Sequence, residues 1–220
     1  MSAVRLMGSL FATLLVMAPA VGAAPPRPPV ALVIEVTGTV EPALEPYSEV
    51  ADKDNVKLAG GARLTFLHYA TCQEVAVSGG RITFTAEAFR VEGGDITHSS
   101  RVDCPRSVTI QPDAVAGAVL LRSLMKARPV VTLDPRPVFV LVGTKATNFT
   151  RIRILRDKKT IFEGKIEGRR FAWPEGEPPL APGWVYALDL LTAGGGKPRT
   201  VAVEVVDQRG RSPLTLIRVD

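Results

Sequence analysis

The sequence is poor in the residues that most catalytic sites need. It has two histidines and two cysteines, and it lacks the Gly-x-Ser-x-Gly, Walker, dinucleotide-binding, His-Glu-x-x-His and Cys-x-x-Cys motifs. Hydrolases that use a Ser/His/Asp or a Cys/His set are therefore disfavoured. We expect a protein that is not an enzyme and uses no cofactor, and a hydrolase of unfamiliar type is the catalytic alternative.

Long uninterrupted helical stretches are also missing. The 220 residues include 19 glycines and 18 prolines, which divide the chain into short segments. Apolar residues make up 46% and charged residues 22%, so disorder along the whole length is excluded. This composition predicts an all-β fold of short strands and tight turns.

The first 24 residues have the pattern of a secretory signal peptide. Arg5 precedes an apolar run over residues 6–17, and a small-residue tail follows. The run is too short for a hydrocarbon core of about 30 Å, so we expect cleavage after Ala23 or Ala24, with a retained anchor as the alternative. The mature protein would be periplasmic or secreted, without a transmembrane segment, and would begin with a proline-rich spacer at 25–29.

Two cysteines in an exported chain most often form one disulfide, so we expect Cys72 to pair with Cys104. The alternative is a zinc site made of His68, Cys72, His98 and Cys104, which would belong to a metal- or stress-linked sensor. An extended backbone at about 3.3 Å per residue puts His68 about 13 Å from Cys72, which favours the disulfide.

Residues 30–111 have the pattern of one small β-domain, a sandwich or roll. Residues 30–36 suit a strand buried on both faces, whereas the acidic segment 41–55 suits a solvated loop. From residue 62 the side chains alternate, which predicts a strand, and Gly79-Gly80 predicts a hairpin turn. Residues 108–110 are expected to be the last strand of this domain.

Residues 30–111 resemble the FecR-type periplasmic domain. The resemblance rests on Val36-x-Gly38-x-Val40, on Leu58-x-x-Gly61-Ala62-x-Leu64-x-Phe66, and on the Gly-Gly strands that follow. The sequence departs from the family at residues 68–72, where members usually place an acidic-glycine turn. The resemblance implies an extracytoplasmic interaction or sensing module, and the iron-signalling role of the family is not carried over.

The remaining residues predict a helical linker and a second β-domain. Residues 112–129 have apolar residues at helical spacing between prolines. Residues 130–220 have the size of a seven-stranded immunoglobulin-like sandwich. The motif Leu180-x-Pro182-Gly183-x-x-Tyr186 resembles the tyrosine corner of fibronectin-III-like sandwiches, which implies a hydrogen bond from Tyr186 to the preceding backbone. The strands are expected at 138–142, 151–155, 160–162, 170–173, 184–191, 200–206 and 214–219.

Residues 145–170 are strongly basic, with nine cations and three acids. An alternating strand with a turn at 156–159 would concentrate the charge on one hairpin. We expect an exported binding or scaffold protein whose partner is an envelope protein, an acidic glycan or a lipid headgroup, and not nucleic acid. The alternative is an edge that uses cations to prevent aggregation. The cations are Lys145, Arg151, Arg153, Arg156, Lys158, Lys159, Lys165, Arg169 and Arg170.

Overall fold

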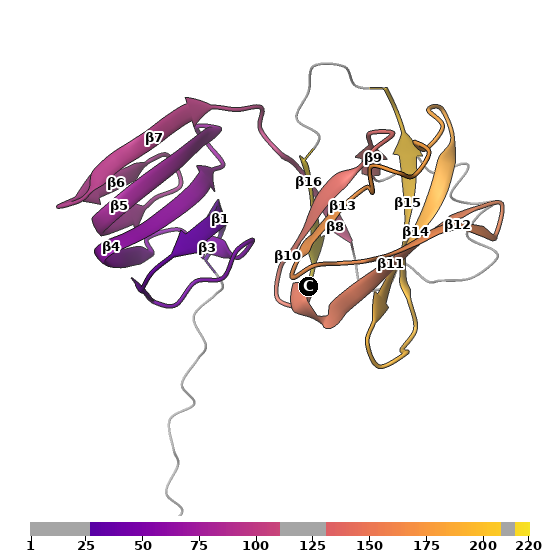
Figure 1. Cartoon of the computed structure of the whole chain (residues 1–220), viewed down its shortest axis with the longest axis horizontal. Coiled ribbons are helices and arrows are strands. Elements are labelled where there is room, and N and C mark those ends of the chain that lie inside the picture. The colour runs from indigo at the N-terminus through magenta and orange to yellow at the C-terminus, as the bar shows by residue number, and fades with distance from the viewer. Residues whose placement is uncertain (1–26, 111–130, 208–213) are drawn as a thin grey trace, which may run out of the picture.

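The computed structural model describes residues 27–110, 131–207 and 214–220, and most of them lie in β-strands. The predicted all-β class is confirmed (Figure 1). The expected signal peptide (1–24), the first part of the spacer and the helical linker (112–129) lie outside the described residues. Within those residues, no helix has the length and hydropathy to cross a membrane.

The first part of the chain forms one curled sheet of seven strands. Its order is β3-β1-β4-β5-β6, with β2 also beside β4 and β7 also beside β5, and every neighbouring pair is antiparallel. The strands are β1 (Pro29–Thr37), β2 (Val40–Glu41), β3 (Glu49–Ala51), β4 (Asn55–His68), β5 (Gln73–Phe84), β6 (Phe89–Glu92) and β7 (Asp95–Arg101).

Several glycines of this sheet lie where the hydrogen-bonded pairing of its two long strands, β4 and β5, changes from one set of neighbours to another. On one side of this change β4 pairs with β1 and β5 with β7, and on the other side β4 pairs with β2 and β5 with β6. Positive φ angles at such a change let a sheet curl around its core. The glycines with φ between +65° and +79° are Gly38, Gly61, Gly79, Gly80 and Gly93.

The hairpin turn predicted at Gly79-Gly80 is wrong, because β5 runs through both residues. A Cβ on Gly80 would overlap the backbone of Gly94, so the pair allows a close crossing of two strands. A kinked strand and a hairpin turn both need residues with positive φ, so a Gly-Gly dipeptide does not distinguish between them. The chain turns instead at residues 69–72 and 85–88.

The predicted disulfide between Cys72 and Cys104 is confirmed, with 5.0 Å between their Cα atoms. Cys72 lies in the turn between β4 and β5 and has φ +52°. Cys104 follows β7, where the chain leaves the first sheet. The disulfide therefore fixes the point at which the chain passes to its second half.

The second half has two sheets that enclose one core. One sheet has the order β13-β10-β16-β8 and the other β12-β11-β14-β15-β9. All seven predicted strands are present, as β10 to β16, and two further strands join them. The elements are β8 (Arg106–Ile110), β9 (Val131–Leu133), β10 (Val138–Val142), the short 3-10 helix η1 (Ala146–Asn148), β11 (Phe149–Arg156), β12 (Lys159–Lys165), β13 (Arg170–Ala172), β14 (Val185–Thr192), β15 (Arg199–Val205) and β16 (Leu214–Val219).

The strand at 106–110 pairs with the second half, although the sequence predicts it in the first. β8 runs parallel to β16, with Val108 opposite Ile217, and Ile110 is part of the second core. The alternation of Val108 and Ile110 identifies a strand but contains no information on its partner, which lies more than 100 residues away.

The hydrogen bond expected of a tyrosine corner is present. The backbone N–H of Ala181 donates to the hydroxyl of Tyr186 at 3.0 Å, and that hydroxyl lies 3.3 Å from the carbonyl of Ala181, to which it donates. Tyr186 is buried at the start of β14, so its hydroxyl gains both partners without reaching solvent.

An apolar cluster joins the two halves. Leu32 and Leu67 of the first sheet pack with Val140, Val142 and Leu216 of the second half. The strand predicted at 30–36 is buried on both faces only at residues 30–33, where one face covers the first core and the other contacts the second half. Beyond them Glu35 is exposed.

Ion pairs surround this cluster. Glu49 accepts hydrogen bonds from Arg218 at 2.5 Å and from the hydroxyl of Tyr69 at 3.0 Å, and Arg169 lies 3.7 Å from Glu45. Burial raises the pKa of Tyr69 far above its usual range, and the charge of Glu49 adds to the effect. Two acids of the segment predicted as a solvated loop thus contribute to the contact between the halves.

Candidate anion-binding site

The predicted basic hairpin is present as β11 and β12. Arg156 pairs with Lys159, and the two residues between them, Asp157 and Lys158, have φ +50° and +67°. Positive φ at both central residues is typical of a type I′ turn, whose twist matches that of the two strands it connects. The cations of β11 and β12 therefore lie on one antiparallel ladder, whose register shifts once, between Ile154 and Leu155.

The strand alternation separates the hairpin into an apolar and a charged face. Ile152 and Ile154 are fully buried in the second core. Arg151 and Arg153 point the other way, where Arg151 lies opposite Lys165 on β12. Two like charges in directly opposite positions repel each other, so this pair has a cost that a bound anion would remove.

Arg153 is neutralised within the fold. Its guanidinium lies 3.2 Å from the carboxylate of Asp189 on β14 and 3.8 Å from that of Glu163 on β12. Asp189 is itself buried and also accepts a hydrogen bond from Thr200 at 2.6 Å. Arg153, which the sequence predicts as a residue that binds the partner, thus forms an ion pair within the fold instead.

Arg169 is occupied as well, because it pairs with Glu45 of the first half. Of the nine cations, seven remain; all seven are exposed, and none of them has an ion pair with any residue that the structure describes. Lys145 lies before β11, and the other six lie on or beside the hairpin. They are Arg151, Arg156, Lys158, Lys159, Lys165 and Arg170, and we call them the free cations of the hairpin.

An aromatic side chain accompanies the free cations at the hairpin tip. The guanidinium of Arg156 lies 5.1 Å from the ring centre of Trp184, which is 50% exposed just before β14. Such stacking leaves the polar edge of the guanidinium free for an anion while it orients the side chain. The sequence did not place Trp184 here, because its contact depends on the pairing of β11 with β14.

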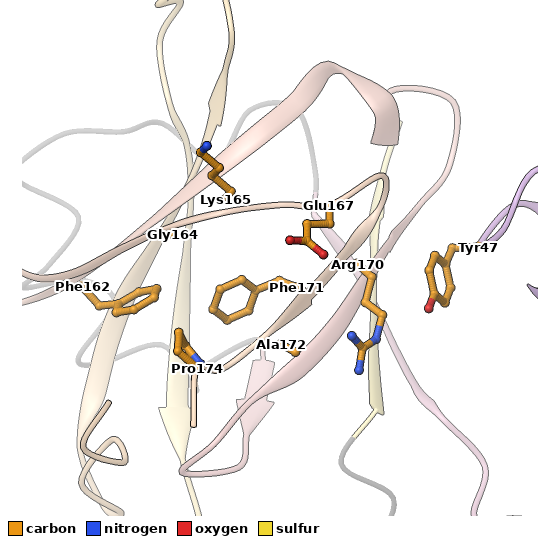
Figure 2. A pocket seen from close by; sticks show the side chains of 9 residues that line it. All are labelled: Tyr47, Phe162, Gly164, Lys165, Glu167, Arg170, Phe171, Ala172 and Pro174. Atoms are coloured by element: carbon orange, nitrogen blue, oxygen red, sulfur yellow. The ribbon is translucent and has the colours of Figure 1, made fainter. Parts of the chain in front are cut away.

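A pocket of about 340 Å³ opens beside the hairpin, between the edge strands β12 and β13 (Figure 2). Phe162 and Phe171 form its apolar part, with ring centres 5.9 Å apart. Charged side chains surround the opening, and Tyr47 belongs to the first half of the chain. The lining residues are Tyr47, Phe162, Gly164, Lys165, Glu167, Arg170, Phe171, Ala172 and Pro174.

The alternative zinc set is not assembled. Both thiols are in the disulfide, so neither Cys72 nor Cys104 is available as a thiolate ligand. His68 is buried, with Nδ1 3.1 Å from the hydroxyl of Thr71 and Nε2 3.0 Å from the carbonyl of Thr85. Both of its ring nitrogens are therefore occupied.

His98 lies apart from His68, exposed on β7, with Nε2 3.2 Å from the hydroxyl of Ser100. In the part of the chain that the structure describes, no group of three or more His, Cys, Asp or Glu side chains has the arrangement of a metal site. The sensor hypothesis built on these four residues is not supported by this geometry.

Comparison with family models, with curated proteins and with solved structures finds no match.

Proposed function

We propose that this protein is an exported, non-catalytic binding or scaffold protein of the cell envelope that holds an anionic partner on the β11–β12 hairpin. The observation that carries the proposal is the position of Arg151 directly opposite Lys165, with neither in an ion pair among the described residues. A hairpin that needed cations only for solubility could alternate them with acids, as Arg153 and Glu163 do one row further on.

The composition of the first 24 residues supports export, and the FecR-type pattern supports an interaction or sensing role. The tip supports an anionic partner, because three cations, Arg156, Lys158 and Lys159, and one acid, Asp157, form the turn, and the ring of Trp184 is exposed beside Arg156. Clustered cations raise the local concentration of anions and speed their association, an effect that salt weakens.

The test compares two triple variants that remove the same charge. Arg151→Ser, Lys158→Ser and Lys159→Ser remove free cations of the hairpin, and Lys57→Ser, Arg63→Ser and Arg101→Ser remove exposed cations of the first sheet. Binding is measured to immobilised heparin, to vesicles that contain phosphatidylglycerol and to a soluble polyglutamate, at 25 mM and 150 mM salt (about 19 Å and 8 Å of screening length).

We expect the hairpin variant to bind at least one probe about tenfold or more weakly, and the control variant to bind as the wild type does. The wild type should lose affinity between the two salt concentrations. The proposal is wrong if the wild type binds none of the three probes at 25 mM salt, or if the control variant loses as much affinity as the hairpin variant.

A further inference from the structure

The free edge of β12 has unpaired backbone groups at regular spacing. β12 is the last strand of its sheet and pairs only with β11 among the strands that the structure describes. The N–H of Ile166 donates to the carbonyl of Thr150, which makes these residues a hydrogen-bonded pair. Because such pairs alternate along an antiparallel ladder, the backbone groups of Glu163 and Lys165 point away from β11.

The inner side of this edge opens into the pocket. The Phe162 ring and the Cα hydrogen side of Gly164 face the core side of the sheet, and both residues line the pocket with Phe171 and Pro174. A strand placed beside β12 would send every second side chain over this opening. An apolar side chain suits its floor, where the rings of Phe162 and Phe171 lie (Figure 2).

The outer side of the same edge is cationic. The rows across the sheet there are Arg151 with Lys165 and Arg153 with Glu163, and Arg153 is already bound to Asp189. The next position in the first of these rows would lie beside Lys165. An acidic side chain at that position would complete a cation-cation-anion row.

We propose that the β12 edge binds an extended acidic segment of a partner polypeptide as an added strand, with alternating acidic and apolar side chains. This inference rests on the proposed function and names the class of its anionic partner. Strand addition takes its affinity from backbone hydrogen bonds and its specificity from alternate side chains, and the β12 edge offers both. A second copy of this chain, added antiparallel at the same edge, would instead place the lysines of its own β12 beside Lys159 and Lys165, and these like charges would repel each other.

The experiment uses the mature chain and a synthetic peptide, acetyl-EVELEVE-amide. Hydrogen exchange of single amides is followed by NMR with and without the peptide. The amides of Glu163 and Lys165 should exchange rapidly in the free protein and at least tenfold more slowly in the complex. Those of Phe162 and Gly164 serve as the control within the same strand, because they already face β11 and should change little.

Two further peptides separate backbone pairing from charge. The first has the same composition in the order EEEEVLV, and the second has N-methyl groups on alternate backbone nitrogens of EVELEVE. Both keep the net charge, and we expect each to bind at least tenfold more weakly. Equal affinity of all three peptides would overturn strand addition and would leave the proposed anionic partner intact.

Two protein variants distinguish strand addition from attraction by charge alone. Glu163→Pro removes an outward N–H and also a negative charge, whereas Glu163→Ala removes only the charge. Attraction by charge alone predicts that both variants bind EVELEVE more tightly than the wild type. Strand addition predicts that Glu163→Pro binds at least tenfold more weakly than Glu163→Ala.

The remaining outcomes are also decisive. Protection of the Glu163 and Lys165 amides that appears without peptide and grows with protein concentration would show pairing with a second copy and would overturn the inference. Binding of heparin or vesicles but not of EVELEVE would overturn it while the proposed function stands. The absence of binding to every anionic probe would contradict the proposed function itself.

Discussion

The surroundings of Tyr69 strongly oppose the ionisation of its hydroxyl, whose pKa is raised by burial and by the charge of Glu49. Its hydroxyl donates to Glu49, which Arg218 also contacts, so the phenol must remain protonated to keep this arrangement. The folded pKa is raised, whereas an unfolded chain releases the proton near its ordinary value of about 10. The protonated Tyr69 hydroxyl therefore contributes to the stability of the folded protein below about pH 10, and this contribution is lost as the pH rises above that value.

We predict that Tyr69→Phe lowers the free energy of unfolding by about 1 kcal/mol at pH 7, because Glu49 loses one hydrogen bond. The variant should also lose stability less steeply than the wild type between about pH 10 and 11. Urea unfolding at pH 7, 10 and 11 measures both effects. Tyr47→Phe is the control, since no hydrogen bond of the Tyr47 hydroxyl to the described residues is seen. Equal pH slopes for the two variants would contradict the assignment.

Arg151 and Arg153 lie on the same face of β11 but have opposite roles. Arg153→Ser leaves Asp189 buried with Thr200 as its remaining side-chain partner, so we expect a loss of roughly 1–3 kcal/mol in stability. Arg151→Ser should change stability by less than about 0.5 kcal/mol and weaken anion binding instead. Thermal unfolding and heparin affinity, measured on both variants, check this division. Equal changes in stability in the two variants would contradict this division of roles between Arg151 and Arg153.

Among the elements, the line of glycines explains the curl of the first sheet. We predict that Gly80→Ala destabilises the protein by more than about 2 kcal/mol, because the new methyl group would overlap the backbone at Gly94 and the φ of +78° is strained. Gly60→Ala is the matched control, since nothing lies within 4 Å of its Cβ position and its φ is not in the left-handed region. Its effect should be within about 1 kcal/mol. Chemical denaturation compares the two, and equal effects would contradict the close crossing.

The strands of the second half could be predicted because they bury alternate apolar residues, as Val201, Val203 and Val205 do in β15, or a continuous apolar run, as in β10. Their partners could not, because a period of two says which face is buried but not what covers it. The parallel pairing of β8 with β16 is therefore invisible in the sequence. A Gly-Gly pair is equally ambiguous, since a turn and a kinked strand need the same φ.

The candidate site shows the same limit. The sequence places the cations on one hairpin, since the turn and the alternation are local features. It does not show that Arg153 meets Asp189, 36 residues further along the chain, or that Tyr47 reaches the pocket from the first half. Those contacts arise from the pairing of strands and from the packing of the two halves. Both join residues that are far apart in the sequence, so a local sequence pattern does not predict them.

For the molecule as a whole, the contact between the halves decides whether they behave as one body. Residues 72 and 104 are joined where the chain leaves the first sheet, and Val102 nearby packs on the apolar cluster. The pocket depends on this contact, because Tyr47 completes its wall from the other half.

Adjacent residues of β1 allow this contact to be tested by itself, since Leu32 packs against the second half and Val33 against the core of the first sheet. We predict that Leu32→Ala speeds hydrogen exchange at Val140 and Leu216 and shifts their amide resonances, because the cavity forms between the halves. Val33→Ala should leave those amides unchanged and lower the stability of the first sheet by roughly 2 kcal/mol, the cost of the methyl groups removed from its core. If Leu32→Ala disturbs only the first sheet, the two halves are held together by the disulfide-anchored connection and the ion pairs, and the apolar cluster has no part in fixing their orientation.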